Sequence, residues 1–182
     1  GLQFAGTGSL SLTSSIVHGN AFGGAAVNAT GECTVIGTIV DNNGQTGSVV
    51  GGMQLACATG LTVENVTFAR NVAGAGAAGK DLACIGPASA LAVRNLIFAS
   101  ATPQLGGCTA TYSVFEGASM PPAGIGNRAV ASAGFVDATG GNFHISASSP
   151  AREAGDPATP AALDVDGETR PQSRWDVGAD EI

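Results

Sequence analysis

Three acidic residues at outward positions of the predicted strands are the first candidates for catalysis: Asp41, Glu64 and Glu116. Hydrolysis of a glycosidic bond by the usual route needs two carboxyl groups that face each other at about 5 to 9.5 Å. Asp41 and Glu116 share a column but are three coils apart, about 14 Å at the spacing of paired strands. Glu64 aligns with Arg94, and His18 aligns with Asp41. Ion pairs between neighbouring coils are therefore the simpler use of these side chains.

An elimination reaction on a uronate would need a cluster of cations and a base. Arg70, Lys80 and Arg94 supply part of such a cluster, but their neighbours are mainly Ala and Gly. The sequence also lacks the paired-aspartate, Gly-His-Gly and Arg-x-Lys motifs that are typical of pectin hydrolases. We therefore expect no catalytic residues, and a polysaccharide lyase or glycoside hydrolase is the alternative.

Two carboxylates near the C-terminus suggest a cation site. Asp164 and Asp166 precede Gly167, an arrangement with which a loop can present oxygens to calcium. A complete twelve-residue calcium loop is absent, because Trp175 occupies the place of the bidentate Glu. The favoured alternative is that Arg170 pairs with one of the aspartates and fixes the tail. We expect Trp175 to cover the apolar end of the last coil.

A repeat determines which elements carry these residues. Apolar residues recur in the same columns of five segments, 10–17, 33–40, 61–68, 91–98 and 108–115. Units of this length with period-2 strands cannot bury an apolar face alone and must stack. The repeat predicts an all-β fold, a parallel β-helix of about five coils, with strands near 10–13, 33–36, 61–64, 91–94 and 108–115. Asn20, Asn43 and Asn71 share a column, where stacked amides can form a ladder.

The four cysteines allow two pairings. Cys57 and Cys84 each lie five residues after a glycine that leads its unit, Gly52 and Gly79, and this alignment stacks them on adjacent coils. The Cα separation of stacked residues, about 4.8 Å, suits a disulfide, so we favour Cys57–Cys84 and leave Cys33 and Cys108 as buried thiols. The alternative, Cys33–Cys57 with Cys84–Cys108, satisfies every cysteine.

Composition limits the partners. The chain has 182 residues, a net charge of −7 and only 12% charged residues, so it has no basic stripe for nucleic acid. No apolar run reaches the length of a membrane span. Eight of the 14 acidic residues lie in residues 151–182. We expect one domain in which residues 1–149 form the coils and residues 150–182 form an irregular C-terminal segment that wraps and caps them.

A set of short motifs resembles a known family. They are Tyr112-Ser-Val-Phe-Glu-Gly117, Gly134-Phe-Val-Asp137, Asn142-Phe-His-Ile145, Ser149-Pro-Ala151, Ala154-Gly-Asp156, Asp164-Val-Asp-Gly167, Arg170-Pro171 and Asp176-Val-Gly-Ala-Asp-Glu181. Their order resembles the C-terminal signature of bacterial right-handed parallel β-helix surface proteins, which are pectin-lyase-like and called choice-of-anchor Q proteins. The chain departs from the family at Arg152-Glu153, where Ile-Asp is usual. The resemblance implies a right-handed parallel β-helix and export to the cell surface or the medium.

Two functions are expected from these features. The first is a non-catalytic structural or adhesive module that touches a polysaccharide or envelope surface. The second is a carbohydrate-active or carbohydrate-binding module that uses the flat outward face of Thr, Asn and Arg residues. Because the first coil presents unpaired strand edges, we also expect an added segment before Gly1 or self-association through the N-terminal coil.

Overall fold

The computed structural model describes residues 1–77, 79–86, 91–101, 105–159, 163–171 and 174–182. Within these ranges the protein is all-β and contains no helix. Its strands are β1 (Leu2–Gly6), β2 (Leu10–Thr13), β3 (Ile16–His18), β4 (Ala25–Ala29), β5 (Glu32–Asp41), β6 (Met53–Cys57), β7 (Gly60–Ala69), β8 (Leu82–Ile85), β9 (Leu91–Ala99), β10 (Leu105–Gly106), β11 (Val114–Glu116), β12 (Arg128–Val130), β13 (Phe135–Asp137) and β14 (Asn142–Ile145).

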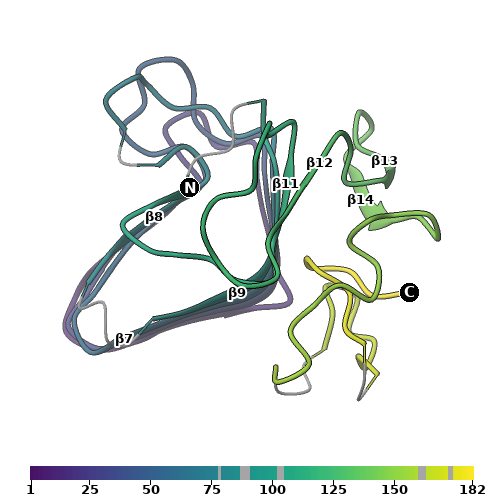
Figure 1. Ribbon diagram of the computed structural model, residues 1–182. Coiled ribbons are helices and arrows are strands. Elements are labelled where there is room, and N and C mark those ends of the chain that lie inside the picture. The colour runs from purple at the N-terminus through teal and green to yellow at the C-terminus, as the bar shows by residue number, and fades with distance from the viewer. Residues whose placement is uncertain (78, 87–90, 102–104, 160–162, 172–173) are drawn as a thin grey trace.

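The first twelve strands form two parallel sheets, which the chain visits in turn. The five-stranded sheet has the order β1-β4-β6-β8-β10, and the seven-stranded sheet has the order β12-β11-β9-β7-β5-β2, with β3 also beside β5. Successive passages lie on top of one another, so the view along the stack shows a superimposed, roughly triangular outline (Figure 1). We call one passage through both sheets a coil. The arrangement is β-helix-like, as the repeat predicts.

The strand register confirms the repeat alignment of the seven-stranded sheet. The aligned positions pair as Leu10 with Cys33, Cys33 with Leu61, Leu61 with Leu91, and Phe98 with Phe115. The fifth copy is shorter than expected, since β11 begins only at Val114 after a single bridge between Arg94 and Thr111. Thus the columns of apolar residues identify the stacking even where the strand itself is short.

A column of left-handed residues bends the long strands of this sheet. Gly37, Asn65 and Asn95 have φ values of 58°, 54° and 57° and lie at equivalent positions of β5, β7 and β9. Ser14 and Tyr112 continue the column with φ values of 41° and 48°. Glycine and asparagine tolerate this conformation better than other residues do. Each long strand therefore turns a corner of the triangle without leaving the sheet (Figure 1).

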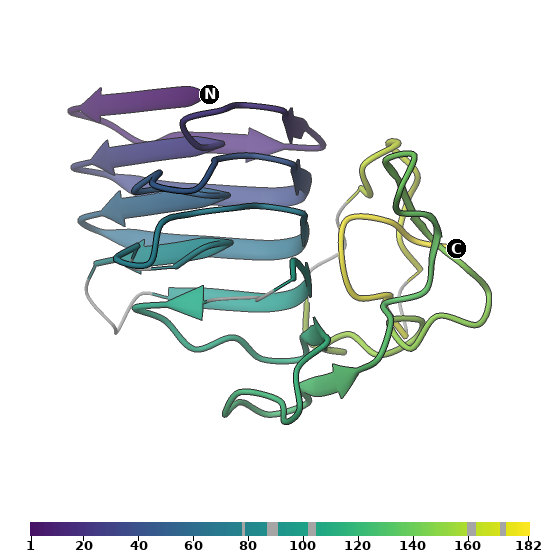
Figure 2. The ribbon, with the colours of Figure 1, turned by 90° about the horizontal axis from the view of Figure 1, so that it is seen from above.

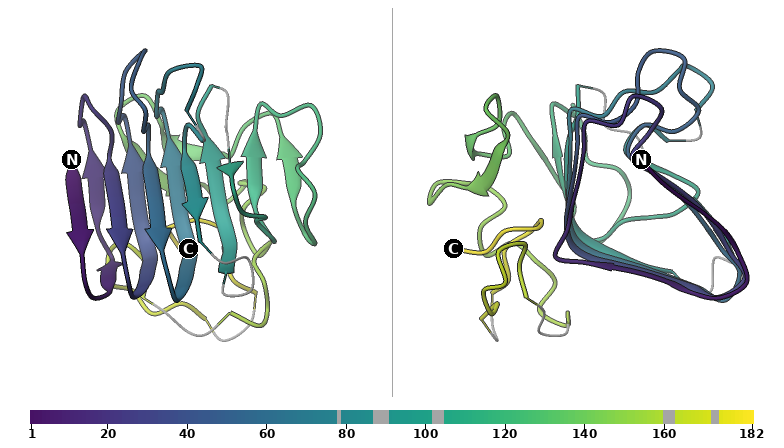
Figure 3. Two further views of the ribbon diagram at one scale, coloured as in Figure 1. Left: turned by 90° about the vertical axis from the view of Figure 1, so that its left-hand side faces the viewer. Right: turned by 180° about the vertical axis from the view of Figure 1, so that it is seen from behind.

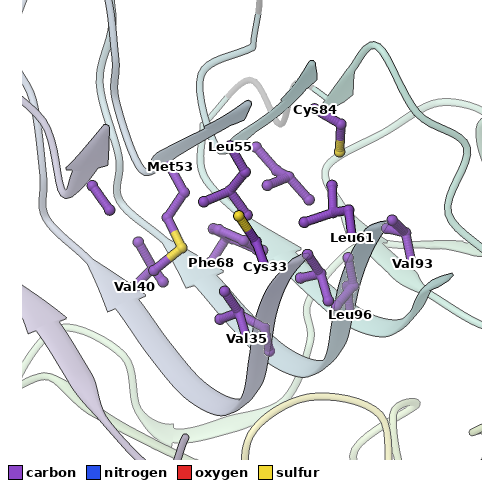
Figure 4. Close-up of a cluster of buried hydrophobic side chains, with 14 of the residues drawn as sticks. Cys33, Val35, Val40, Met53, Leu55, Leu61, Phe68, Cys84, Val93 and Leu96 are labelled. Carbon is purple, nitrogen blue, oxygen red and sulfur yellow. The ribbon is translucent and has the colours of Figure 1, made fainter. Parts of the chain in front are cut away.

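The inner core lies between the two sheets. Val35, Val63 and Phe68 from one sheet meet Met53 and Leu55 from the other, and all five are almost fully buried (Figure 4). Phe68, Phe98 and Phe115 stack with ring centroids 5.4 and 4.8 Å apart. The predicted asparagine ladder is present at the next corner, where Asn20 Nδ2 donates to Asn43 Oδ1 at 2.9 Å and Asn43 Nδ2 donates to Asn71 Oδ1 at 3.2 Å.

The C-terminal part of the chain forms a second layer, which we call the outer layer and define as the described residues of 131–182. It contains the antiparallel hairpin of β13 and β14 and otherwise irregular segments. It lies beside the seven-stranded sheet, along the stack (Figures 2 and 3). The amides of Ala179 and Gly178 donate to Thr67 Oγ1 and to the carbonyl of Asn95, at 3.0 and 2.9 Å. Ser14 Oγ donates to the carbonyl of Asp164 at 3.1 Å.

The outer layer therefore reaches from late coils back to the first coil, along the side of the stack. It starts before residue 150, because the chain leaves the parallel sheets after β12. Trp175 is buried in this layer, where its carbonyl accepts from the amide of Gly155 at 2.8 Å, and it is not part of the inner core. Apolar contacts between the layer and the outer face of the sheet form further clusters around Ile97 and Ile39.

The disulfides are Cys33–Cys57 and Cys84–Cys108, so the favoured pairing Cys57–Cys84 is wrong and the alternative is correct. The error lies in the register of the five-stranded sheet. Cys84 pairs with Leu55, two residues before Cys57, because β8 is led by Asp81 and not by Gly79. Each bond joins cysteines with Cα atoms 5.9 or 5.6 Å apart, and none of the four is a free thiol.

Candidate functional site

A cleft of about 480 Å³ lies where the outer layer meets the first coils. Its walls come from β3, the end of β5, the residue after β7 and the loop between β13 and β14. The residues that line it are Ile16, His18, Ile39, Asp41, Asn42, Arg70, Thr139, Gly140, Gly141 and Phe143. Apolar and charged groups therefore meet in one concave surface, which is typical of sites for small molecules.

Asp41 is the centre of the polar side of the cleft. Its side chain is 3% exposed, yet the carboxylate is bound on both oxygens. Arg70 donates from Nε to Oδ1 at 2.7 Å and from Nη2 to Oδ2 at 2.5 Å, and His18 Nδ1 lies 2.7 Å from Oδ2. His18, Asp41 and Arg70 come from three successive coils. In the seven-stranded sheet His18 pairs with Asp41, and Asp41 pairs with Ala69, the residue before Arg70. The predicted alignment of His18 with Asp41 is confirmed.

His18 is oriented by this carboxylate. Because a carboxylate accepts hydrogen bonds, Nδ1 is the donor in this contact. The side chain is 55% exposed, and among the described residues no hydrogen bond involves Nε2. Nε2 of His18 is therefore the ring nitrogen that can form a hydrogen bond with a ligand in the cleft.

Arg70 connects the coils to the outer layer. Its Nη1 donates to the carbonyl of Thr139 at 3.0 Å, and its guanidinium lies 5.1 Å from the ring centroid of Phe143. The hydrogen bond to Asp41 raises the pKa of Arg70, against the smaller opposing effect of burial. The residue itself has a left-handed backbone, with φ of 52°. The guanidinium is thus held by three neighbours, Asp41, Thr139 and Phe143.

The cleft has the chemistry of binding more than that of hydrolysis. Asp41 is the one carboxylate among the residues that line it, and both of its oxygens are engaged. Asp137 lies near enough for its charge to raise the pKa of Arg70, but its Oδ1 accepts from the amide of Gly140 at 2.9 Å. A pair of free, facing carboxyl groups, as ordinary glycoside hydrolysis needs, is therefore not formed by these residues.

The other predicted catalytic candidates lie elsewhere. Glu64 pairs with Arg94 at 2.8 Å, as expected, and Arg94 also reaches Asp156 of the outer layer at 3.1 Å. Glu116 accepts from the amide of Ala133 at 2.7 Å, where the outer layer begins. Of the three predicted cations only Arg70 lines the cleft; Lys80 belongs to the segment before β8. Glu64, Arg94 and Glu116 thus connect neighbouring coils or join the coils to the outer layer.

Asp164 and Asp166, the predicted calcium ligands, have different environments. Asp164 is fully buried, and its Oδ1 accepts from the amides of Asp166 and Glu168 at 3.0 and 2.8 Å. The side chain of Asp166 is 51% exposed. One oxygen of Asp164 thus stabilises the turn that the sequence predicts, while Asp166 points its carboxylate to a different neighbour, His144, at 3.4 Å.

Arg170 is a buried lock, but its hydrogen-bonding partner is not Asp164 or Asp166. Its Nη1 donates to Glu181 Oε2 at 2.8 Å, and its Nη2 donates to the carbonyl of Gly178 at 2.7 Å. Burial lowers the pKa of Arg170, and the nearby charges of Glu181 and Asp164 oppose this. Burial likewise raises the pKa of Glu181 to about 7.

The flat outward face that was expected to contact carbohydrate is partly covered. Thr38, Asn65, Thr67 and Asn95 lie under the outer layer and are at most 1% exposed. Asn95 alone donates to Asn65 and to Thr159 and accepts from the amide of Asp156. The cleft at the edge of this layer was missed, because Thr139 to Phe143 carry no spacing signal that relates them to the coils. Phe143, between polar residues in the Asn-Phe-His motif, is the only hint.

Comparisons with known proteins give no relative: no family model, no curated protein and no solved structure matches the chain. Among the described residues there is no helix long and apolar enough to cross a membrane. The two disulfides are consistent with an extracellular protein.

Proposed function

We propose that the protein is a non-catalytic structural or adhesive module, secreted or displayed on a bacterial cell surface. Its fold in this proposal is a right-handed parallel β-helix of about five coils with the outer layer bound along its side. The family resemblance in residues 112–181 supports export and handedness. The parallel sheets and the two disulfides support a rigid extracellular unit.

One observation carries this proposal: the outer layer ties coils together that are far apart in the stack. It contacts Ser14 in the first coil, Thr67 in β7 and Asn95 in β9, and a salt bridge joins Asp156 to Arg94. Each disulfide also closes a segment of 24 residues. Such cross-connections oppose local opening. A surface module that is exposed to force and to proteases needs this resistance.

The test is adhesion of beads coated with the full chain to cell envelopes and to purified polysaccharides. A structural or adhesive module is expected to bind an envelope surface without consuming or releasing any soluble sugar. Release of unsaturated or reducing products from any polysaccharide by the wild-type chain, lost in His18→Gln, would contradict a non-catalytic function and support the lyase or hydrolase alternative.

The cleft favours carbohydrate binding as a second candidate. The exposed side chain of Ile16 and the fixed polar groups of His18 and Arg70 combine an apolar contact with directed hydrogen bonds, beside the buried ring of Phe143. A glycan array separates the candidates. Specific binding that is lost in Ile16→Ser, with the melting temperature retained because Ile16 is exposed, would support the cleft; adhesion that persists in this variant would assign it to another surface.

A further inference from the structure

A second cluster of polar side chains lies in the outer layer and shares no residue with the lining of the cleft. It consists of His144 from β14, Asp166 from the turn at 164–167 and Asp180 from the C-terminal segment, and their ligand-type atoms all lie within 4.8 Å of one another. His144 Nδ1 is 2.8 Å from Asp180 Oδ1 and 3.4 Å from Asp166 Oδ2. Three segments that are separate in the sequence thus direct one atom each to the same point.

The separations suit a small metal ion. In a tetrahedral zinc site with ligand bonds of about 2.0 to 2.1 Å, neighbouring ligand atoms are about 3.3 Å apart. The two separations from His144 Nδ1, 2.8 and 3.4 Å, are near this value. Small side-chain shifts would complete one face of a tetrahedron. Asp166 and His144 are 51% and 45% exposed, so a fourth position remains open to water.

Two further observations concern the surroundings. Asp180 is 3% exposed and already oriented, because its second oxygen accepts from the amide of Ile145 at 2.7 Å. Such support from the backbone is common for metal ligands. Asp164, next to the cluster in the same turn as Asp166, is fully buried and its Oδ2 has no hydrogen-bond partner. Its charge acts on His144. Three aspartates therefore surround His144, and Asp164 is also within range of the positive charge of Arg170.

We propose that His144, Asp166 and Asp180 bind a divalent transition-metal ion, with Zn²⁺ as the representative ion. One imidazole and two carboxylates are ligands that such ions accept, whereas Ca²⁺ takes six to eight oxygens. The site differs from the calcium site expected at Asp164 and Asp166, since Asp164 is not one of its ligands. Its effect is structural: the ion joins the hairpin, the turn and the C-terminal segment.

The competing explanation is an ion triad without metal, in which a protonated His144 bridges the two aspartates. Both explanations account for the same contacts, so the experiment must separate them. At about pH 8 an ordinary imidazole is neutral and its nitrogen is free to bind a metal. A triad without metal predicts no saturable zinc binding under these conditions.

The experiment titrates the metal-stripped full chain with ZnCl₂ in a calorimeter at about pH 8 and records thermal unfolding with Zn²⁺, Co²⁺ or Ca²⁺. The expected result is one zinc per chain and a higher melting temperature with Zn²⁺. The Co²⁺ form should show the strong visible absorption of low coordination number. Ca²⁺ should have little effect.

His144→Gln and Asp166→Asn should each weaken zinc binding at least tenfold. Asp166 is half-exposed, so its variant tests the site even if the His144 variant folds poorly. His18→Gln, which changes the other of the two histidines, is the matched control and should bind zinc like the wild type. Absence of saturable zinc binding, equal affinity in Asp166→Asn, or a preference for Ca²⁺ would each overturn the proposal.

Discussion

Asn43 and Asn71 form a buried pair in which one side chain serves both the backbone and the side chain of its neighbour. Asn71 Oδ1 accepts from the amide of Asn43 at 3.1 Å and from its Nδ2 at 3.2 Å. Asn71 Nδ2 in turn donates to the carbonyl of Val40 and to Asp81 Oδ1, at 2.9 and 3.0 Å. The ladder therefore satisfies polar groups that the tight corner would otherwise bury without partners.

Asn43→Ala should lower the free energy of unfolding by about 2 to 3 kcal/mol, because buried donors and acceptors on both neighbouring coils lose their partner. Urea unfolding measures the change. Asn20→Ala is the control: Asn20 lies at the exposed end of the ladder and contacts only one asparagine, so its loss should cost clearly less. Equal losses at the two positions would contradict a cooperative ladder.

The disulfide connectivity can be checked directly. Peptide mapping without reduction should recover Cys33 linked to Cys57 and Cys84 linked to Cys108. Replacing Cys33 and Cys57 together by Ala should lower stability by about 3 kcal/mol, since a closed segment of this length restricts the unfolded chain by roughly that amount. A Cys57–Cys84 peptide would show that the register of β6 and β8 is wrong.

Stability should fall as the pH rises from about 4.5 to about 7. The pKa of Glu181 is raised to about 7 in the folded protein, mainly by burial, so the native state holds a proton that the unfolded chain has released. The resulting stabilisation is fully present below the unfolded value of about 4.5 and is lost as the pH rises through the folded value, up to about 3 kcal/mol. Burial raises the pKa of Asp176 too, which adds in the same direction.

The measurement is urea unfolding across this pH range, with EDTA present to exclude metal effects. Glu181→Gln is the matched variant: it keeps an oxygen acceptor for Arg170 and removes the titrating group. Its stability should depend on pH less than that of the wild type. An unchanged slope would assign the pH dependence to other groups.

The N-terminal edge of the stack should support self-association. Among the described residues β1 pairs only with β4, and because Leu2 and Gly6 use their backbone toward β4, the backbone of Gln3 and Ala5 faces the free edge. Leu2, Ile16 and Phe22 are exposed at this end. Light scattering over a dilution series should show oligomers that Ala5→Pro abolishes and Ala5→Ser retains. A wild-type chain that is monomeric at every concentration is the contrary result.

The sequence predicts the parts of the fold that repeat. Columns such as Cys33, Leu61 and Leu91 are periodic because each residue meets its own equivalent in the next coil, and the same is true of His18 over Asp41 and Glu64 over Arg94. The five-stranded sheet is less predictable. The segment before β8 is two residues longer than the glycine alignment implies. Cys84 therefore lies beside Leu55, and the disulfide partners differ from the favoured ones.

The outer layer is not predictable in this way, because its contacts have no period. Nothing in the sequence relates Thr139 to Arg70, His144 to Asp180, or Asp164 to Ser14. These contacts depend on how an irregular chain packs against a surface that the coils create. The candidate metal site lies in this layer, and the candidate cleft lies where the layer meets the coils. The repeat thus predicts the scaffold and the pairing of His18 with Asp41, whereas the contacts of the outer layer with these coils are not predicted.

The contact between Ser14 and Asp164 spans 150 residues and has a consequence for the order of assembly. During synthesis or export from the N-terminus, the coils can stack one by one, but their side stays bare until the last residues arrive. This side carries polar residues whose groups can bind water until the outer layer replaces it: Thr38, Asn65, Thr67 and Asn95. Docking of the C-terminal residues is then the final folding step, and a truncated chain would remain an open, hydrated stack.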